Sequence, residues 1–199
     1  MNKYRTALMN RPFMYIESKR IAEMMLQGKS EEECRYEAIE LNALQMPSQD
    51  RRKTSYKEIS HRLFFLDDFL LEKFRDSDAY TAKAILAYAI LQADQLYYEF
   101  MREVYLEKIL LLQKELTKKE VLNFLYKKAE QSEVVNKWGD NTKERLAVGF
   151  MQMMRESGFI VSNHEEHQVK RPLINQGVRE YLRKNGIKPA VEILLGELL

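Results

Sequence analysis

The chain has 199 residues, of which 45% are hydrophobic and 31% charged, and its formal net charge is +2 at pH 7. This composition excludes a disordered tail, and the length suffices to bury the core of one domain or of two small ones. The single cysteine excludes an internal disulfide, and the N-terminus lacks the apolar core of a signal peptide. The longest apolar run is far shorter than the roughly 20 residues that span a bilayer. We therefore expect a cytoplasmic, all-α protein that does not contact a membrane.

Three helices are predicted in the first third of the chain. Apolar residues at helical spacing place the first helix at residues 15–27. Ser30 and Glu33 have the spacing of a capping box, which opens a second helix that runs to about residue 42. Its inward residues are Cys34, Ala38 and Leu41. Ser48 follows a proline turn and caps the third helix, whose inner face is Tyr56, Ile59, Leu63 and Leu66.

The third helix opens with an excess of positive charge. Residues 48–63 contain five basic and two acidic residues, and residues 1–20 contain five basic residues and one acidic residue. One interpretation is a solvated face without a role, and the other is a site that binds phosphates. Two helices joined by a short turn also resemble a helix-turn-helix, although antiparallel helix pairs are common in any α-protein. The candidate phosphate contacts are Arg51, Arg52, Lys53, Lys57 and Arg62, extended by Arg11, Lys19 and Arg20.

The middle of the chain is strongly apolar. After a short helix that contains Asp67 and Asp68, Ser77 or Asp78 caps a helix that is apolar on nearly all sides, which is typical of the buried centre of a bundle. Asp94 caps a long helix with an inward face of Tyr97, Phe100, Met101, Val104, Lys108 and Leu111. We place the end of an N-terminal helical bundle, residues 1–115, after this helix.

Residues 116–199 are predicted to form a second helical subdomain that resembles a winged helix. Thr117 and Glu120 have capping-box spacing, and Asp140 or Asn141 caps a strong helix that Gly158 ends. Two short apolar runs around a polar tip then predict a β-hairpin, whose wing carries Lys170 and Arg171. The reading helix, about residues 141–157, holds Lys143, Arg145 and Arg155 against Glu144 and Glu156. Winged helices also serve as protein-docking modules, so this pattern leaves both roles open.

The last predicted helix, which begins near Pro189, is very apolar and docks either on its own domain or on another chain. Catalytic signatures are missing: the sequence has no glycine-rich phosphate loop and no G-x-S-x-G motif. His164 and His167 are three residues apart beside two glutamates, but no third metal ligand is evident nearby. The residues thus favour a protein that is not an enzyme and has no cofactor or metal.

In order along the chain, four stretches carry a family resemblance: "AEMMLQGKSEEECRYEAIELNALQMPSQDRRKTSYKEISHRL", "KAILAYAILQADQLYYEFMREV", "KWGDNTKERLAVGFMQMMRESGFI" and "RPLINQGVREYLRKNG". Across residues 4–186 the chain resembles the BrxA component of bacteriophage exclusion (BREX) systems. The resemblance implies a small all-helical protein of a phage-defence system, with a fold compared to NusB-type antitermination factors. It also implies nucleic-acid binding without enzymatic activity, and it offers no catalytic motif.

The main hypothesis is a monomeric accessory protein that binds nucleic acid through its phosphate backbone and works with other phage-defence proteins. We expect DNA rather than RNA because of the defence context alone. The alternatives are a protein–protein scaffold within the same defence complex and a NusB-like RNA-binding factor. A metal-dependent or hydrolytic enzyme is the weakest reading.

Overall fold

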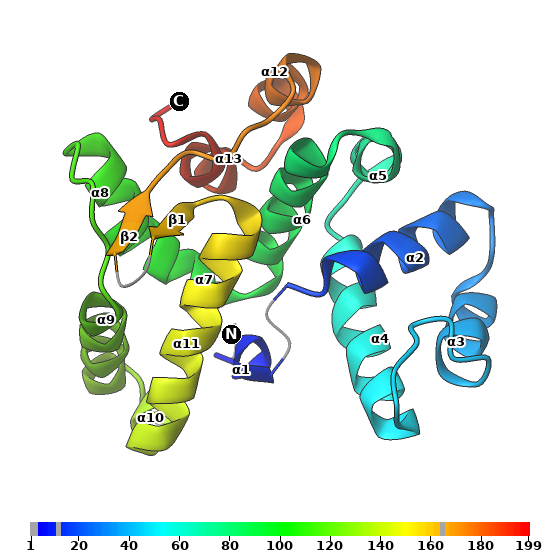
Figure 1. The fold of residues 1–199 in the computed structure, drawn as a ribbon, viewed down its shortest axis with the longest axis horizontal. Helices are drawn as coiled ribbons and strands as arrows, with labels where there is room; N and C mark the ends of the chain where they lie inside the picture. The colour runs from blue at the N-terminus through cyan, green and yellow to red at the C-terminus, as the bar shows by residue number, and fades with distance from the viewer. Residues whose placement is uncertain (1–3, 11–12, 164–165) are drawn as a thin grey trace.

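The computed structural model describes residues 4–10, 13–163 and 166–199. These residues form helices joined by short turns, together with one two-stranded antiparallel hairpin (Figure 1). The expected all-α fold with a single short hairpin is confirmed. None of the described helices combines the length and the apolar character that crossing a membrane requires.

The first part of the chain forms a set of packed helices whose starts follow local capping signals. Ser30 Oγ accepts from the Glu33 amide and the Glu33 carboxylate accepts from the Ser30 amide, as the capping box predicts. Ser48 Oγ accepts from the Arg51 amide at the start of the basic helix. The elements are α1 (Ala7–Asn10), α2 (Tyr15–Leu26), α3 (Glu31–Ile39), α4 (Gln49–Leu63) and α5 (Asp68–Asp76). We refer to α2–α5 as the N-terminal group.

The second helix is shorter than predicted. It ends at Ile39, and Leu41, expected to face inward, is 63% exposed. Asn42 and Gln45 both have φ of 55°, so the chain leaves the helical path through two left-handed residues before Pro47. The inward placement of Leu41 is therefore wrong, whereas Cys34 and Ala38 are buried as predicted.

The middle of the chain supplies the centre of the molecule. Its elements are α6 (Ala79–Ala93), α7 (Gln95–Phe100), the π-helical segment η1 (Met101–Leu106) and α8 (Glu107–Leu110). Asp78 caps α6, which is buried along most of its length, as expected. Leu111, predicted to face inward, is 60% exposed because α8 ends at Leu110 and the chain turns at Leu112, where φ is 57°.

The last part of the chain contains α9 (Lys118–Gln131), α10 (Glu133–Asn136), α11 (Asp140–Ser157), β1 (Ile160–Asn163), β2 (Glu166–Val169), α12 (Gln176–Asn185) and α13 (Lys188–Leu195). The strands pair antiparallel, with Ile160 opposite Val169. Glu115 forms an isolated bridge with Gln168, which adds a short third segment beside the hairpin. Gly139, rather than Asp140 or Asn141, occupies the cap position of α11, and it offers no side-chain cap.

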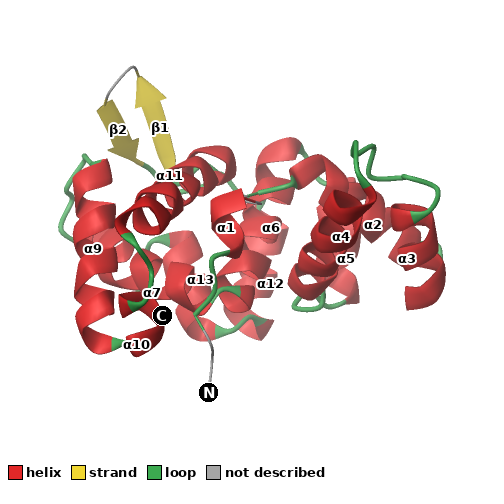
Figure 2. Ribbon diagram, turned by 90° about the horizontal axis from the view of Figure 1, so that it is seen from below, coloured by secondary structure: helices red, strands yellow, loops and turns green. Residues whose placement is uncertain are grey.

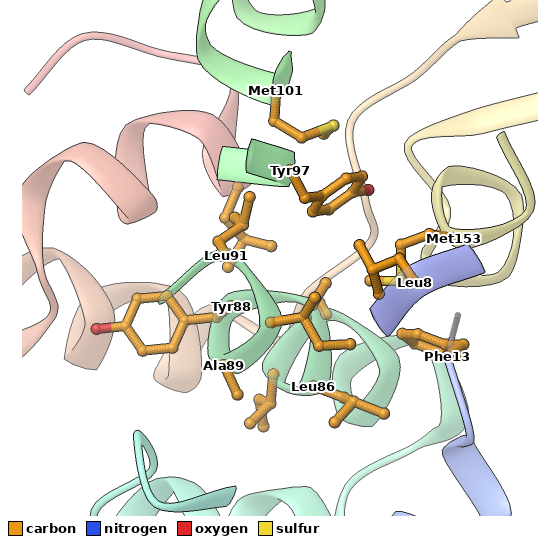
Figure 3. Close-up of a cluster of buried hydrophobic side chains, with 14 of the residues drawn as sticks. Leu8, Phe13, Leu86, Tyr88, Ala89, Leu91, Tyr97, Met101 and Met153 are labelled. Carbon is orange, nitrogen blue, oxygen red and sulfur yellow. The ribbon is translucent and has the colours of Figure 1, made fainter. Parts of the chain in front are cut away.

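Helix α6 lies between the N-terminal group and the helices that carry the hairpin (Figure 1), and it contacts α4, α5, α11 and α13. Figure 3 shows Leu86 and Tyr88 of α6 in one buried cluster with Leu8, Tyr97 and Met153. The apolar C-terminal helix α13 packs on α6 and η1, so it docks within its own chain. Several contacts join helices that precede residue 115 to helices that follow it, namely α6 with α11 and α13, and α1 with α11. The division into two subdomains at this residue stays a prediction.

A buried carboxyl group lies where α6 meets α7. Asp94 Oδ1 accepts from the Tyr97 amide, while Oδ2 has no hydrogen-bond partner among the described residues. Burial raises the pKa of Asp94, although the Tyr97 amide and the nearby Arg5 oppose that shift. Between the ordinary pKa of an aspartate and the raised one, the folded state therefore holds more protons than the unfolded state, and stability falls as the pH rises through that range.

We expect Asp94→Asn to remove this loss, because asparagine caps helices as well as aspartate does and carries no charge. The difference in the free energy of unfolding, variant minus wild type, should grow as the pH rises from 4 to 7. Urea unfolding at several pH values measures this difference. A difference that is constant with pH would show that Asp94 is not the group responsible.

Candidate nucleic-acid interface

Arg62 does not face the solvent. It is 0% exposed, and its Nε lies 3.2 Å from Oε1 of Glu58 while Nη1 donates to the Phe13 carbonyl. Glu58 is also buried and pairs with Arg5 at 3.1 Å. The placement of Arg62 among the outward phosphate contacts is wrong, because it falls on the inward face of α4 beside Ile59 and is neutralised there by Glu58.

Three other candidate cations are held by backbone carbonyl groups. Nη1 of Arg52 donates to the Ile39 carbonyl at 2.8 Å, at the end of α3. Nζ of Lys19 donates to the Arg75 carbonyl at 2.7 Å, and burial lowers the pKa of Lys19. Arg20 donates to the Ala43 carbonyl and to Oε1 of Gln45. Arg52, Lys19 and Arg20 are each only partly exposed, and each donates at least one hydrogen bond that joins segments of the N-terminal group. Arg11 lies outside the described residues.

Three exposed cations remain on α4, but they do not form one patch. Arg51, Lys53 and Lys57 are exposed and form no ion pair with any residue that the structure describes. Lys53 and Lys57 are four residues apart and share one side of the helix, whereas Arg51 lies two positions before Lys53, about 160° away around the axis. Arg51 therefore does not share a side of α4 with Lys53 and Lys57, and a joint surface with the cations of the first twenty residues stays a prediction.

A second basic surface lies away from α3 and α4, where the hairpin leaves α11 (Figure 2). Lys170 and Arg171, both exposed, follow β2 and border a hollow of about 390 Å³ together with Lys83 of α6 and Arg155 of α11. Tyr105 Oη donates to the Lys170 carbonyl at 2.7 Å, which fixes the backbone of this segment. Arg171 also donates to the Gly196 carbonyl at 3.1 Å, so part of its guanidinium has a structural role. Glu156 is the one acidic side chain that borders this hollow.

An exposed stripe runs along α11 toward this hollow. Its members recur every three or four residues, and the side chains are Asn141, Arg145, Val148, Gln152 and Arg155. Of the charged residues of the expected reading helix, Lys143 is buried and donates to the Trp138 carbonyl, Glu144 pairs with Lys118, and Glu156 accepts from Gln152. The stripe itself contains two arginines and no acid.

Helix α1 packs beside this stripe. Nη2 of Arg145 donates to Oδ1 of Asn10 at 2.7 Å. A side chain at Gly149 would overlap the carbonyl group of Leu8, so α1 lies directly on the backbone of α11 at that glycine. The exposed residues of α11 therefore lie between α1 and the hairpin.

A family model for BrxA matches residues 2–186. The chain belongs to the BrxA family. A relative from Bacillus cereus (strain H3081.97), named BREX protein BrxA, is 31% identical over 194 residues, which cover 98% of this chain and 97% of the relative. A second BREX protein BrxA, from Paramagnetospirillum magneticum (strain ATCC 700264 / AMB-1), is 26% identical over 170 residues, 85% of this chain and 84% of that protein.

The fold of this BrxA-family chain also occurs in a solved structure. The crystal structure of an uncharacterized protein from Magnetospirillum magneticum superposes with a TM-score of 0.83 at 22% identity, and the match covers 98% of this chain and all of that one. The names of the family and its relatives describe no enzymatic activity. Among the residues with described placement, no three His, Cys, Asp or Glu side chains gather in a way that would hold a metal ion. His164 lies outside those residues, and Nδ1 of His167 lies 2.8 Å from Ser162 Oγ.

The family match does not assign binding residues. The sequence analysis named only some of the cations that border the hollow beside the hairpin in this BrxA-family protein. Lys170 and Arg171 were predicted to lie on the wing, and the structure places both directly after β2. Arg155 was counted among the charges of the predicted reading helix but was not named as a contact. Lys83 was not named because it lies far away in the sequence, on a helix predicted to be buried on nearly all sides. No local pattern indicates that Lys83 borders the same hollow as Arg171.

Proposed function

We propose that this protein binds nucleic acid, preferentially duplex DNA, as a non-enzymatic accessory component of a BREX phage-defence system. The surface that binds is the exposed stripe of α11 together with the cations beside the hairpin. The observation that carries the proposal is that Arg145 and Arg155 share an exposed stripe of α11 without an acid, and that Arg155 borders the same hollow as Lys170.

The order of elements supports the same surface. After α8 come the short segment at Glu115, α9, the short helix α10, α11 and the two strands of the hairpin, and Glu115 bridges Gln168. This is the order of a winged helix, in which the helix before the hairpin enters the major groove and the wing contacts the backbone. The helix that enters would be α11, and the wing cations would be Lys170 and Arg171. The names of the relatives support the defence role.

Phosphate contacts predict a strong salt dependence. Each cation that neutralises a phosphate adds about 0.9 to the slope of log affinity against log salt on duplex DNA. We expect the triple variant Arg145→Ala/Arg155→Ala/Lys170→Ala to flatten that slope by about 2 to 3 units. The measurement is fluorescence anisotropy on a 20-base-pair duplex at several salt concentrations.

The matched control is Arg51→Ala/Lys53→Ala/Lys57→Ala, which removes three exposed cations from the other end of the molecule. Its slope should stay within about 0.5 unit of the wild type, since losing even one phosphate contact changes the slope by about 0.9. A flattened slope in this control, with an unchanged slope in the α11 variant, would place the interface on α4 instead. Tighter binding of an RNA of equal length than of the duplex would contradict the preference for DNA and favour a NusB-like role.

A further inference from the structure

A groove of about 870 Å³ lies within the N-terminal group, at the end of the molecule away from the hairpin. Helices α2, α3 and α4 form its walls, and α2 contacts both of the others. Most of the surface that lines the groove is apolar, and its apolar residues include Ile21 and Met25 from α2, Ile39 from α3, and Tyr56 and Phe64 at and beyond α4. Phe64 is 81% exposed and Met25 is 37% exposed, so part of this apolar surface meets water.

The rim of the groove carries cations without counter-ions. Arg35, Lys53 and Lys57 border it, are exposed and form no ion pair within the described part of the chain. Lys29 also borders the groove but is paired with Glu37 at 2.7 Å. Glu31 is the acidic side chain on the rim, so unpaired positive charge prevails.

The combination of an apolar floor and a basic rim does not suit nucleic acid as well as it suits protein. Phosphate backbones bind to polar and basic surfaces. An exposed apolar side chain such as Phe64 instead favours binding when apolar groups of a partner cover it, because this removes its surface from water. The groove wall between Lys53 and Phe64 is eleven residues long, which is about 16 Å along the helix axis. This length equals three turns of a docked helix. Amphipathic helices bind such grooves through apolar anchors that recur every three or four residues.

We propose that this groove docks an amphipathic, acidic segment of a partner protein. Apolar side chains of the segment cover Met25 and Phe64, and its carboxylates pair with Arg35, Lys53 and Lys57. The site is separate from the nucleic-acid surface of α11 and the hairpin, so the two proposals stand or fall independently.

The test is a display selection with the full-length protein and a library of random 16-residue peptides. The enriched peptides should carry net negative charge and apolar residues at a spacing of three to four. Their affinity for Lys53→Glu/Lys57→Glu, and separately for Phe64→Ser, should fall at least tenfold. Because all three side chains are exposed, far-ultraviolet circular dichroism should show that both variants remain folded.

Two variants control for charge and for apolar exposure outside the groove. Lys184→Glu reverses an exposed charge on α12, and Tyr36→Ser removes a 58% exposed aromatic side chain from the outer side of α3. Both should bind the enriched peptides within about twofold of the wild type. Enriched peptides that are basic, or that bind the groove variants and the wild type equally, would overturn the proposal. The proposal would also be overturned if no peptide binding depended on Lys53 and Phe64 while binding of a 16-nucleotide single-stranded DNA or of dodecanoate did.

Discussion

Glu58→Leu is expected to lower the free energy of unfolding by about 3–5 kcal/mol, because it removes the carboxylate that pairs with the buried Arg62 guanidinium. Arg62 is fully buried, and Glu58 is the carboxylate with which it pairs. Burial lowers the pKa of Arg62, and the charge of Glu58 opposes that shift, so removing Glu58 removes the main compensation for desolvation. Arg5 loses the same partner, but it can turn toward water because its side chain is 34% exposed.

The measurement is guanidinium or thermal unfolding, in which this loss corresponds to a decrease in melting temperature of about 6–20 °C for a chain of this size. The double variant Glu58→Leu/Arg62→Met replaces both members of the pair with apolar side chains and should recover most of the lost stability. A double variant that is less stable than Glu58→Leu alone would contradict the view that loss of the Glu58 carboxylate beside the buried Arg62 charge is the cause. It would point instead to the bond from Arg62 to the Phe13 carbonyl.

Gly149→Leu is expected to destabilise the protein by about 2–3 kcal/mol, which is the free energy of exposing one large apolar side chain. Any side chain at Gly149 overlaps the Leu8 carbonyl, and helix α1 has no room to shift while it remains on α11. Helix α1 should then leave α11, and Leu8, now 1% exposed, should become accessible.

The readouts are chemical unfolding and limited proteolysis, in which the variant should be cut within residues 4–10 under conditions that leave this segment of the wild type intact. The matched control is Val148→Leu, since Val148 is 52% exposed and precedes Gly149 on the same helix. The control should change stability by less than about 0.5 kcal/mol, as surface substitutions usually do. Equal effects of the two substitutions would show that α1 is not held at Gly149.

Most of the helix starts were predictable because their capping bonds are local. Ser30, Asp78, Thr117 and Asn175 each accept from an amide two or three residues further along, so the spacing of residue types suffices to recognise them. The cap of α11 was predicted wrongly, since Gly139 holds that position without a side-chain bond. The π-helical segment of Met101–Leu106 was not predicted either, because the spacing of its apolar residues fits a continuous α-helix equally well.

The amino-acid sequence by itself determined the all-α class, the hairpin and the number of cations near the start of α4, since these depend on periodicity, short-range caps and composition. Only the tertiary structure decided which cations reach water. Arg62 meets the Phe13 carbonyl 49 residues away, and Lys19 meets the Arg75 carbonyl 56 residues away. A cation binds whichever carboxylate or carbonyl group the folded chain brings within hydrogen-bond distance, and no local spacing encodes that partner. The same reason places Lys83 beside Lys170 and leaves Lys53 and Lys57 unpaired at the edge of an apolar groove.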